Sequence, residues 1–198
     1  MNKKSLNRIF PSVCFGLMVL CMPAYFTLKL NGEEKKGTVS SAEAEKEKAL
    51  KNPYPNDLGP DKIDVSKYNP EQQEGYKLML DKCAKCHTPS RPLNSQFVDL
   101  KVEDIAAMKK SNPEMFKDKL VWQIETGIWQ RYVKRMMAKP GCNIADAEGK
   151  KIFKFLLEDS KRRKTGTAAA TWSTHRKKLL ADFKTKYPDH YKKLFETK

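Results

Sequence analysis

The segment Cys-Ala-Lys-Cys-His at residues 83–87 restricts the identity of this chain more than any other feature. It brings two thiols and an imidazole together in a chain that has only three histidines. Three kinds of site use such a set of side chains: a structural zinc ion, a redox-active disulfide and a covalently attached haem. Each of them makes a different demand on the surrounding sequence.

The spacing of the remaining ligands disfavours the first two kinds of site. Zinc needs four ligands, usually supplied as two close pairs. Beyond Cys83 and Cys86, the other candidates are Cys142, His175 and His190, which are scattered and form no second pair. A redox-active Cys-x-x-Cys is expected within a βαβ pattern, whereas the sequence here favours helix.

Covalent haem agrees with the motif directly. On a helical turn the thiols of Cys83 and Cys86 face the same way, so each can add to one of the two vinyl groups of a porphyrin. His87 then lies beneath the iron as its proximal ligand. Because C-x-x-C-H is specific for this attachment, we expect one haem c, bound through Cys83, Cys86 and His87.

The sequence around the motif predicts helices and no strand. Asn69, Pro70 and Gln72 have the pattern of an N-cap, a first-turn proline and a capping box. Tyr76 and Met79 then start an apolar face that continues to the first cysteine of the motif. Further helices are expected over residues 102–110, 114–132, 143–163 with Asn143 as N-cap, and 171–195, as one helix or two broken at Pro188.

The N-terminus carries an apolar run, Ile9–Leu28, that contains no charged residue. Twenty helical residues span about 30 Å, enough to cross the apolar core of a bilayer. Lys3, Lys4 and Arg8 precede the run, which favours a cytoplasmic N-terminus. We favour an uncleaved transmembrane anchor over residues 1–28, with a cleaved signal peptide or a lipoprotein as alternatives. Residues 29–68 then read as a flexible tether that packs no core.

The choice of sixth iron ligand decides between an electron carrier and a haem enzyme. Methionine fills the site and raises the potential, whereas an open site permits chemistry with small molecules. Met136 shares a helical face with Trp129 and Val133, which favours it over Met137, about 100° further round the same helix. Met137 is therefore the second choice.

Residues 69–160 resemble a class I monohaem cytochrome c. The resemblance rests on Gly75 and Tyr76 before the CAKCH segment, on YVKRMMAKPGCNI, and on ADAEGKKIFKFLLEDS as a closing helix. It implies an all-α, cytochrome c-type helical haem domain whose first and last helices cross at Gly75, with His–Met ligation and one-electron transfer. It also implies that the carbonyl of Pro89 or Pro92 accepts a hydrogen bond from the ligand histidine.

Several other side chains have candidate roles near a haem. Arg91, Trp122, Trp129 and Tyr132 can donate hydrogen bonds to haem propionates. Cys142 is expected to be a free, partly buried thiol. The two tail histidines, His175 and His190, are expected at the surface.

The charge of the chain is concentrated in its last segment. The net charge is +15, and residues 161–198 hold twelve Lys or Arg against three acidic residues. A nucleic-acid binder would spread basic residues over the folded domain, so no nucleic-acid partner is expected. We expect a basic amphipathic helical tail whose apolar side packs on the haem domain and whose basic side faces an acidic redox partner. A lipid surface is the alternative for this basic side.

These expectations combine into an electron carrier rather than an enzyme. It would be anchored in the cytoplasmic or another energy-transducing membrane, with its haem domain on the outer, periplasmic or equivalent, side. Its partner would be a membrane redox complex with an acidic docking surface, such as a bc-type complex, an oxidase or a photosynthetic reaction centre. The alternatives are a fixed cytochrome c subunit of a larger membrane oxidoreductase complex, and a haem enzyme or gas sensor.

Overall fold

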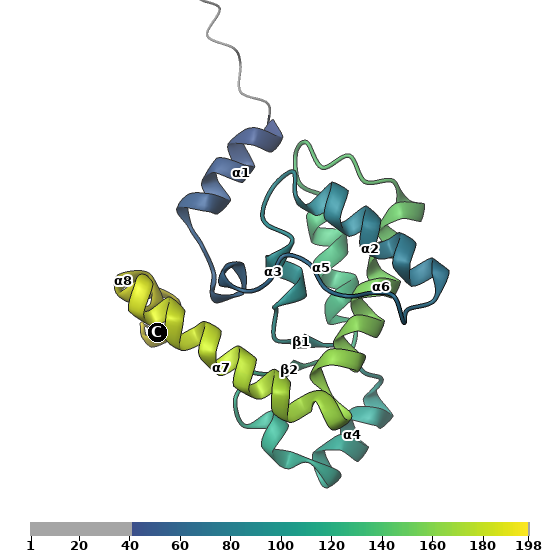
Figure 1. Cartoon of the computed structure of the whole chain (residues 1–198), viewed down its shortest axis with the longest axis vertical. Coiled ribbons are helices and arrows are strands. Elements are labelled where there is room, and N and C mark those ends of the chain that lie inside the picture. The colour runs from purple at the N-terminus through teal and green to yellow at the C-terminus, as the bar shows by residue number, and fades with distance from the viewer. Residues whose placement is uncertain (1–40, 198) are drawn as a thin grey trace, which may run out of the picture. The chain divides into compact units, whose positions relative to one another are not determined.

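The computed structural model describes residues 41–197, which form a mostly helical domain (Figure 1). The expected anchor, residues 1–28, and the beginning of the expected tether lie outside these residues. Within the described part of the chain, no helix is both long enough and apolar enough to cross a membrane. The α-helices are α1 (Ser41–Lys51), α2 (Pro70–Cys83), α3 (Ser90–Leu93), α4 (Val102–Ser111), α5 (Ile128–Met137), α6 (Asp146–Lys164), α7 (Ala169–Lys186) and α8 (Pro188–Tyr191).

Short turns and one strand pair connect these helices. The 3₁₀ turns are η1 (Pro55–Leu58), η2 (Pro113–Phe116) and η3 (Gly166–Ala168), and η4 (Lys192–Glu196) is a π-helical turn. Strands β1 (Phe97–Val98) and β2 (Gln123–Ile124) pair in parallel. The expectation of no strand is therefore wrong for this pair, since two-residue strands are too short to show an alternating pattern.

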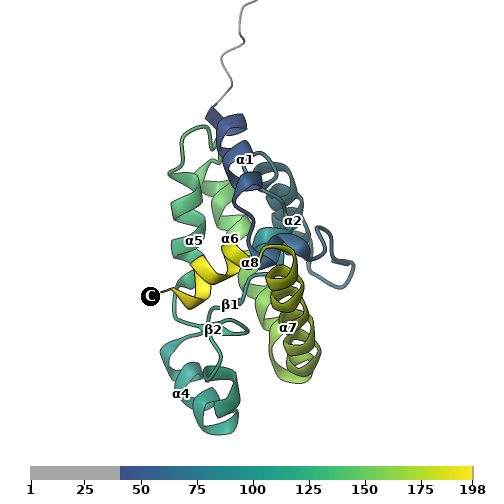
Figure 2. The same ribbon diagram turned by 90° about the vertical axis from the view of Figure 1, so that its left-hand side faces the viewer.

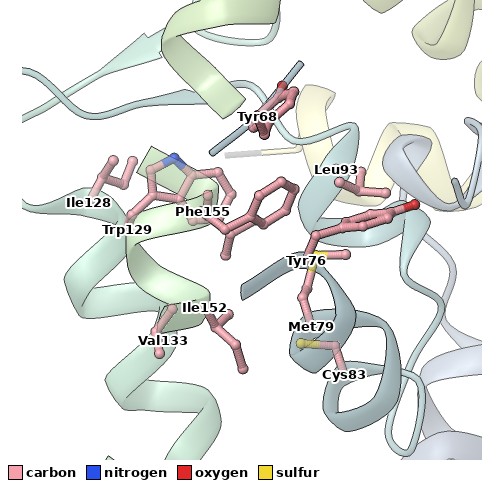
Figure 3. Close-up of a cluster of buried hydrophobic side chains, with 11 residues drawn as sticks. Tyr68, Tyr76, Met79, Cys83, Leu93, Ile128, Trp129, Val133, Ile152 and Phe155 are labelled. Atoms are coloured by element: carbon pink, nitrogen blue, oxygen red, sulfur yellow. The ribbon is translucent and has the colours of Figure 1, made fainter. Parts of the chain in front are cut away.

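Helices α2 and α6 cross at a glycine and build the core. The N-cap of α2 is as expected, because the Asn69 side chain accepts from the Gln72 amide at 2.9 Å while the Gln72 side chain accepts from the Asn69 amide. A Cβ atom at Gly75 would clash with the Lys151 carbonyl and lie 2.9 Å from Cβ of Phe155. Gly75 therefore allows the two helix backbones to approach closely. Figure 3 shows the apolar cluster around this crossing, formed by Tyr68, Tyr76, Met79, Cys83, Leu93, Ile128, Trp129, Val133, Ile152, Phe155 and Leu156.

Helix α5 begins later than the sequence predicts. The expected helix over residues 114–132 is wrong, because η2 and β2 occupy its first part. Gly127 adopts a left-handed conformation with φ of 69°. The Asp99 carboxylate accepts hydrogen bonds from the amides of Gly127 at 2.8 Å and Trp129 at 3.1 Å. A carboxylate distant in sequence thus caps the first turn of α5, and no local pattern could have revealed it.

The start of α6 also differs by a few residues. Asn143 is not its N-cap, since the helix begins at Asp146 after Ala145. The Glu148 carboxylate accepts from the Ala145 amide at 2.9 Å, and the Asn143 carbonyl accepts from Lys82 Nζ at 3.4 Å. The expected cap residue is therefore used to join this loop to α2.

The second half of the expected tether belongs to the folded domain. Tyr68 is buried, and its hydroxyl donates to the Asp159 carboxylate at 2.9 Å. The Ile63 amide donates to the Tyr76 hydroxyl at 3.0 Å. The expectation that residues up to 68 pack no core is thus wrong for this part, because single aromatic and polar anchors replace a periodic apolar face.

The basic tail packs against the domain, as its apolar spacing indicates. Trp172 of α7 is buried, with its indole donating to the Val121 carbonyl at 3.1 Å. Arg176 is also buried, and its guanidinium donates to the carbonyls of Leu120 at 2.8 Å and Asn94 at 2.9 Å. The chain breaks between α7 and α8 at Pro188, as expected. Figures 1 and 2 show α7 alongside the domain and α4 at the end farthest from α1.

Candidate haem-binding site

Cys83 is the last residue of α2, and Cys86 and His87 follow the helix. The Cys83 carbonyl accepts from the amides of Cys86 at 3.3 Å and His87 at 3.2 Å, so a tight turn continues directly from the helix end. Cys83 is buried among the core residues, and Cys86 is half-buried. Both are free thiols. The turn thus holds the three motif residues close together along the backbone, although their side chains do not gather as a metal-holding group in the described part of the chain.

The environment of the thiols is unlike that of a redox-active pair. Burial raises the pKa of the Cys83 thiol to about 12, and the nearby Cys142 and Cys86 add to the effect. The pKa of Cys142 is also raised, chiefly by burial and then by Cys86. Reactive Cys-x-x-Cys pairs instead have a lowered pKa on the attacking thiol. The raised pKa of Cys83 therefore argues against repeated disulfide exchange at this pair.

The imidazole of His87 is oriented by a carbonyl. Nδ1 lies 2.8 Å from the Thr88 carbonyl oxygen. Because a carbonyl only accepts, Nδ1 carries the proton and Nε2 keeps its lone pair for a metal. Burial lowers the pKa of His87, which keeps the ring neutral near pH 7. His87 therefore has the tautomer and the charge of an iron ligand.

The orienting carbonyl is not one of the two expected ones. Pro89 O accepts from the Leu93 amide at 3.4 Å, and Pro92 O accepts from the Ser95 amide at 3.3 Å. Both carbonyls are thus used within the turn of α3 and the residues that follow it. The expectation of Pro89 or Pro92 is replaced in this structure by the Thr88 carbonyl.

A pocket of about 210 Å³ lies beside His87. Its walls come from α1, η1 and the C-terminal end of α7, where Leu50, Leu58 and Tyr187 supply apolar surface. This volume is below the range of about 300–1,000 Å³ typical of ligand pockets. The donor set fits haem c, but a porphyrin would enter only if neighbouring side chains moved apart.

The two candidate methionines have different surroundings. Sδ of Met137 lies 2.5 Å from the position that a Cβ atom at Gly149 would occupy, so this thioether packs directly on the backbone of α6. Met137 also packs against the core cluster. Met136 is half-buried and belongs to neither apolar cluster of the described residues. Met137, rather than Met136, thus packs against the cluster that contains Trp129 and Val133, so the face expected to be shared with Met136 is not seen. Neither methionine lines the pocket beside His87.

The expected propionate donors separate into two groups. The indole N–H of Trp122 donates to the Lys164 carbonyl at 2.9 Å, and that of Trp129 donates to Ser160 Oγ at 2.8 Å. Both indoles are therefore committed to the protein and do not suit this role. Arg91 adjoins the pocket beside His87. Tyr132 packs edge-on against Trp129, and burial raises its pKa.

The remaining cysteine and the tail histidines do not complete a metal site with the motif. Lys82 pairs with Glu148 at 2.9 Å and thereby holds the loop of Cys142 against the end of α2. His175 Nε2 lies 3.1 Å from Asn94 Oδ1. Both histidines, His175 and His190, are half-buried rather than on the surface as expected. Among residues 41–197, no three His, Cys, Asp or Glu side chains gather to hold a metal ion.

Two residues at this site escaped the sequence analysis. Asp57 binds both Thr88 and Arg91, and Arg176 joins α7 to η1 through Asn56. Asp57 lies in the segment assigned to the tether, and Arg176 lies in the tail. The only local signal was the Pro-Tyr-Pro-Asn-Asp run at residues 53–57, whose prolines favour a fixed turn.

Comparison with known proteins adds no assignment, since no family model, curated protein or solved structure matches the chain.

Proposed function

We propose that this protein is a c-type cytochrome that carries one electron at a time. In this proposal Cys83 and Cys86 form thioether bonds to a haem, and His87 and Met136 bind its iron. The observation that carries the proposal is the tight turn after α2, which keeps Cys86 and His87 next to Cys83 along the backbone, together with the buried His87 imidazole whose Nδ1 is directed to the Thr88 carbonyl. A redox disulfide would not need this imidazole orientation. A zinc-bound histidine would share it, so zinc is disfavoured instead by the lack of a second ligand pair among the described residues.

The arrangement of the helices supports the same proposal. The helix that precedes the motif crosses the closing helix α6 where Gly75 meets the Lys151 carbonyl. This is the contact that the resemblance to class I cytochromes c implies. The first and last helices of the domain thus pack together beside the cysteine that ends α2.

The protein supplies position and environment, and the haem would supply the reversible one-electron change of its iron. The Thr88 carbonyl orients the His87 ring, and the apolar core around Cys83 excludes water. Methionine ligation would favour ferrous iron and raise the potential. Of the expected donors to haem propionates, Tyr132 remains the candidate, because the Arg91 guanidinium is bound by the Asp57 carboxylate.

Membrane attachment and the redox partner are further parts of the proposal. The apolar run at residues 9–28 would anchor the chain, with the haem domain on the outer side of an energy-transducing membrane. The exposed lysines of α7 and η4 would meet an acidic surface on a membrane redox complex. A fixed subunit of a larger complex would use the same haem site.

Covalent attachment can be tested on the denatured protein. The full chain, expressed with a cytochrome c maturation system, should keep haem stain on a denaturing gel at one haem per chain. Cys83→Ser and Cys86→Ser should each weaken the attachment to a single bond, and the double variant should lose it. Cys142→Ser is the matched control and should retain the stain. Haem that extracts completely into acidified acetone would overturn the proposal.

A further inference from the structure

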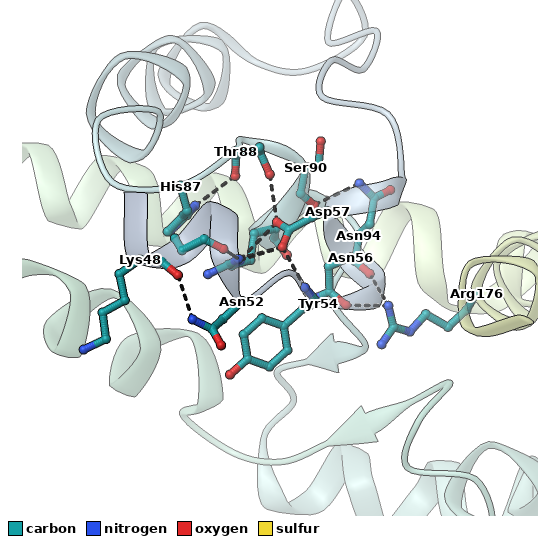
Figure 4. A network of polar contacts seen from close by, with 12 residues as sticks. Lys48, Asn52, Tyr54, Asn56, Asp57, His87, Thr88, Ser90, Asn94 and Arg176 are labelled. Carbon is teal, nitrogen blue, oxygen red and sulfur yellow. Dashed lines mark hydrogen bonds and ion pairs between the residues drawn. The ribbon is translucent and has the colours of Figure 1, made fainter. Parts of the chain in front are cut away.

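A buried carboxylate lies behind the loop that carries His87 (Figure 4). Asp57 Oδ1 accepts a hydrogen bond from the Thr88 hydroxyl at 2.8 Å. The carbonyl of the same Thr88 lies 2.8 Å from Nδ1 of His87. Thr88 is thus fixed through its side chain to η1 and through its backbone to the imidazole.

Three groups hold the Asp57 carboxylate: the Thr88 hydroxyl, the Arg91 guanidinium and the Tyr54 amide. Arg91 binds it with two nitrogens, Nε to Oδ1 at 3.0 Å and Nη2 to Oδ2 at 2.6 Å. The Tyr54 amide donates to Oδ2 at 2.9 Å, and the Tyr54 ring lies 4.9 Å from the Arg91 guanidinium carbon. The exposed fractions of the side chains are 10% for Asp57 and 17% for Arg91. A two-nitrogen ion pair with so little solvent contact has a defined geometry and is stronger than a surface pair.

The segment that carries Asp57 is fixed independently of His87. Asn56 Nδ2 donates to the Arg91 carbonyl at 3.1 Å, and Asn56 Oδ1 accepts from Nη1 of the buried Arg176. The 3₁₀ turn η1 is therefore attached both to α3 and to α7. Asp57 consequently acts from a rigid support rather than from a mobile linker.

We propose that Asp57 is a positioning residue for His87 and acts through Thr88. By holding the Thr88 hydroxyl, the carboxylate keeps the adjacent carbonyl directed at Nδ1 and so fixes the plane and the tautomer of the ring. Hydrogen bonding of this kind raises the electron density of a metal-bound imidazole and favours the oxidised metal. The role assigned to Asp57 depends on the proposed haem function.

The test uses the full haem-loaded chain, four single variants and one double variant. Asp57→Asn removes the charge and its pairing with Arg91, and Thr88→Val removes the hydroxyl with little change in shape. Thr88→Ser keeps the hydroxyl and is the conservative rescue. Asp64→Asn is the matched control, since Asp64 lies in the same segment and its carboxylate is bound by Ser66 rather than by Thr88 or Arg91.

Two measurements report on the ring itself. In the reduced protein, exchange of the His87 Nδ1 proton is measured by NMR, and the midpoint potential is measured by spectroelectrochemical titration. Asp57→Asn and Thr88→Val should speed the exchange on the order of tenfold, the effect of losing one hydrogen bond, and should shift the potential upward. Thr88→Ser and Asp64→Asn should match the wild type. The double variant Asp57→Asn/Thr88→Val should add little to either single change, because both remove the same link.

The outcomes separate the two proposals. If the wild-type chain attaches no haem, the proposed function fails before Asp57 is examined. If haem is attached but Asp57→Asn and Thr88→Val leave both the exchange and the potential equal to those of Asp64→Asn, the positioning role is wrong. A loss of thermal stability without a change at the ring would likewise assign Asp57 to the fold alone.

Discussion

At the scale of single residues, the adjacent methionines at the end of α5 differ in what they contact. Met137 packs on Gly149 of α6. If Met136 binds the iron, as we propose, Met136→Ala should abolish the weak far-red band of methionine-bound ferric haem and lower the midpoint potential. Met137→Ala should keep the band and lower the free energy of unfolding by about 2 kcal/mol, the cost of a partly buried methionine. Optical spectra and urea titrations of both variants give the comparison. The reverse pattern would assign the iron to Met137.

Lys164 is a fully buried lysine between two indoles. Its Nζ lies 5.2 Å from the ring centre of Trp129 and 4.9 Å from that of Trp172, and it donates to the Phe97 carbonyl at 3.1 Å. Burial lowers its pKa well below the ordinary value, and Arg163 and Arg176 act in the same direction, whereas Asp159 opposes them. The indole faces favour the ammonium, but they supply no full counter-charge, and the Asp159 carboxylate is already bound by Arg163 at 2.6 Å.

The lowered pKa predicts a stability that depends on pH. Between the folded-state pKa and the unfolded value near 10.5, the unfolded chain binds more protons than the folded chain. Stability should therefore rise with pH in this window, by at most about 1.4 kcal/mol per pH unit. Lys164→Met should remove this contribution. In denaturant titrations from pH 7 to 10, the free energy of unfolding of the wild type should rise relative to that of the variant. If the two free energies change with pH in parallel, the prediction is wrong.

The motif and the groups behind it differ in how far the sequence reveals them. Cys83, Cys86 and His87 were predictable because their chemistry depends on spacing within one turn. Asp57 was not, because its partner Arg91 lies 34 positions further along the chain and no local spacing connects the two residues. A sequence reveals local spacing, whereas a buried ion pair becomes visible only once the fold is known.

At the scale of elements, the crossing of α2 and α6 depends on one missing side chain. A methyl group at Gly75 would meet the Lys151 carbonyl, which is part of the helix backbone and cannot rotate away. Gly75→Ala should therefore lower the free energy of unfolding by about 3 kcal/mol through overpacking. The control is Lys77→Ala on the exposed side of the same helix, with an expected change within about 0.5 kcal/mol. Equal stability of the two variants in urea titration would show that the helices can separate at no cost.

Elements with local signals were predicted well, and elements fixed by distant groups were not. The capping pattern at Asn69 and the break at Pro188 act within a few residues, and both appear in the structure. Helix α5 was placed too early because its first turn is capped by Asp99 from another part of the chain. The apolar residues Trp122 and Ile124, which suggested a helix, instead belong to the strand region.

At the scale of the whole molecule, the tail is part of the domain rather than an appendage. Two of its basic residues, Lys164 and Arg176, are buried, and Arg163 pairs with Asp159. Some of the basic residues of the tail are therefore structural. Counting Lys and Arg in the sequence cannot separate these residues from basic residues that dock on a partner. Deleting the tail would expose these groups and the buried Trp172, so it cannot separate docking from folding. Substitution of exposed lysines is the cleaner experiment.

Several exposed tail lysines make no ion pair with a described residue, among them Lys177, Lys192 and Lys193. Changing all three to Glu should leave the haem spectrum intact, since their side chains contact neither the motif nor the core. If the tail faces an acidic redox partner, electron transfer to that partner should slow by about tenfold or more at low ionic strength, and the difference should shrink as salt is added.

The matched control makes the same change in net charge at the far end of the domain. Lys101, Lys110 and Lys119 are exposed around α4 and η2, and replacing them with Glu tests whether total charge alone governs the rate. If the tail docks on the redox partner, electron transfer from the tail variant should be slow, and electron transfer from the α4 variant should stay close to the wild-type rate. Equal slowing of both variants would indicate nonspecific attraction. A tail variant with a normal rate but weakened binding to anionic vesicles would show instead that the basic side faces lipid.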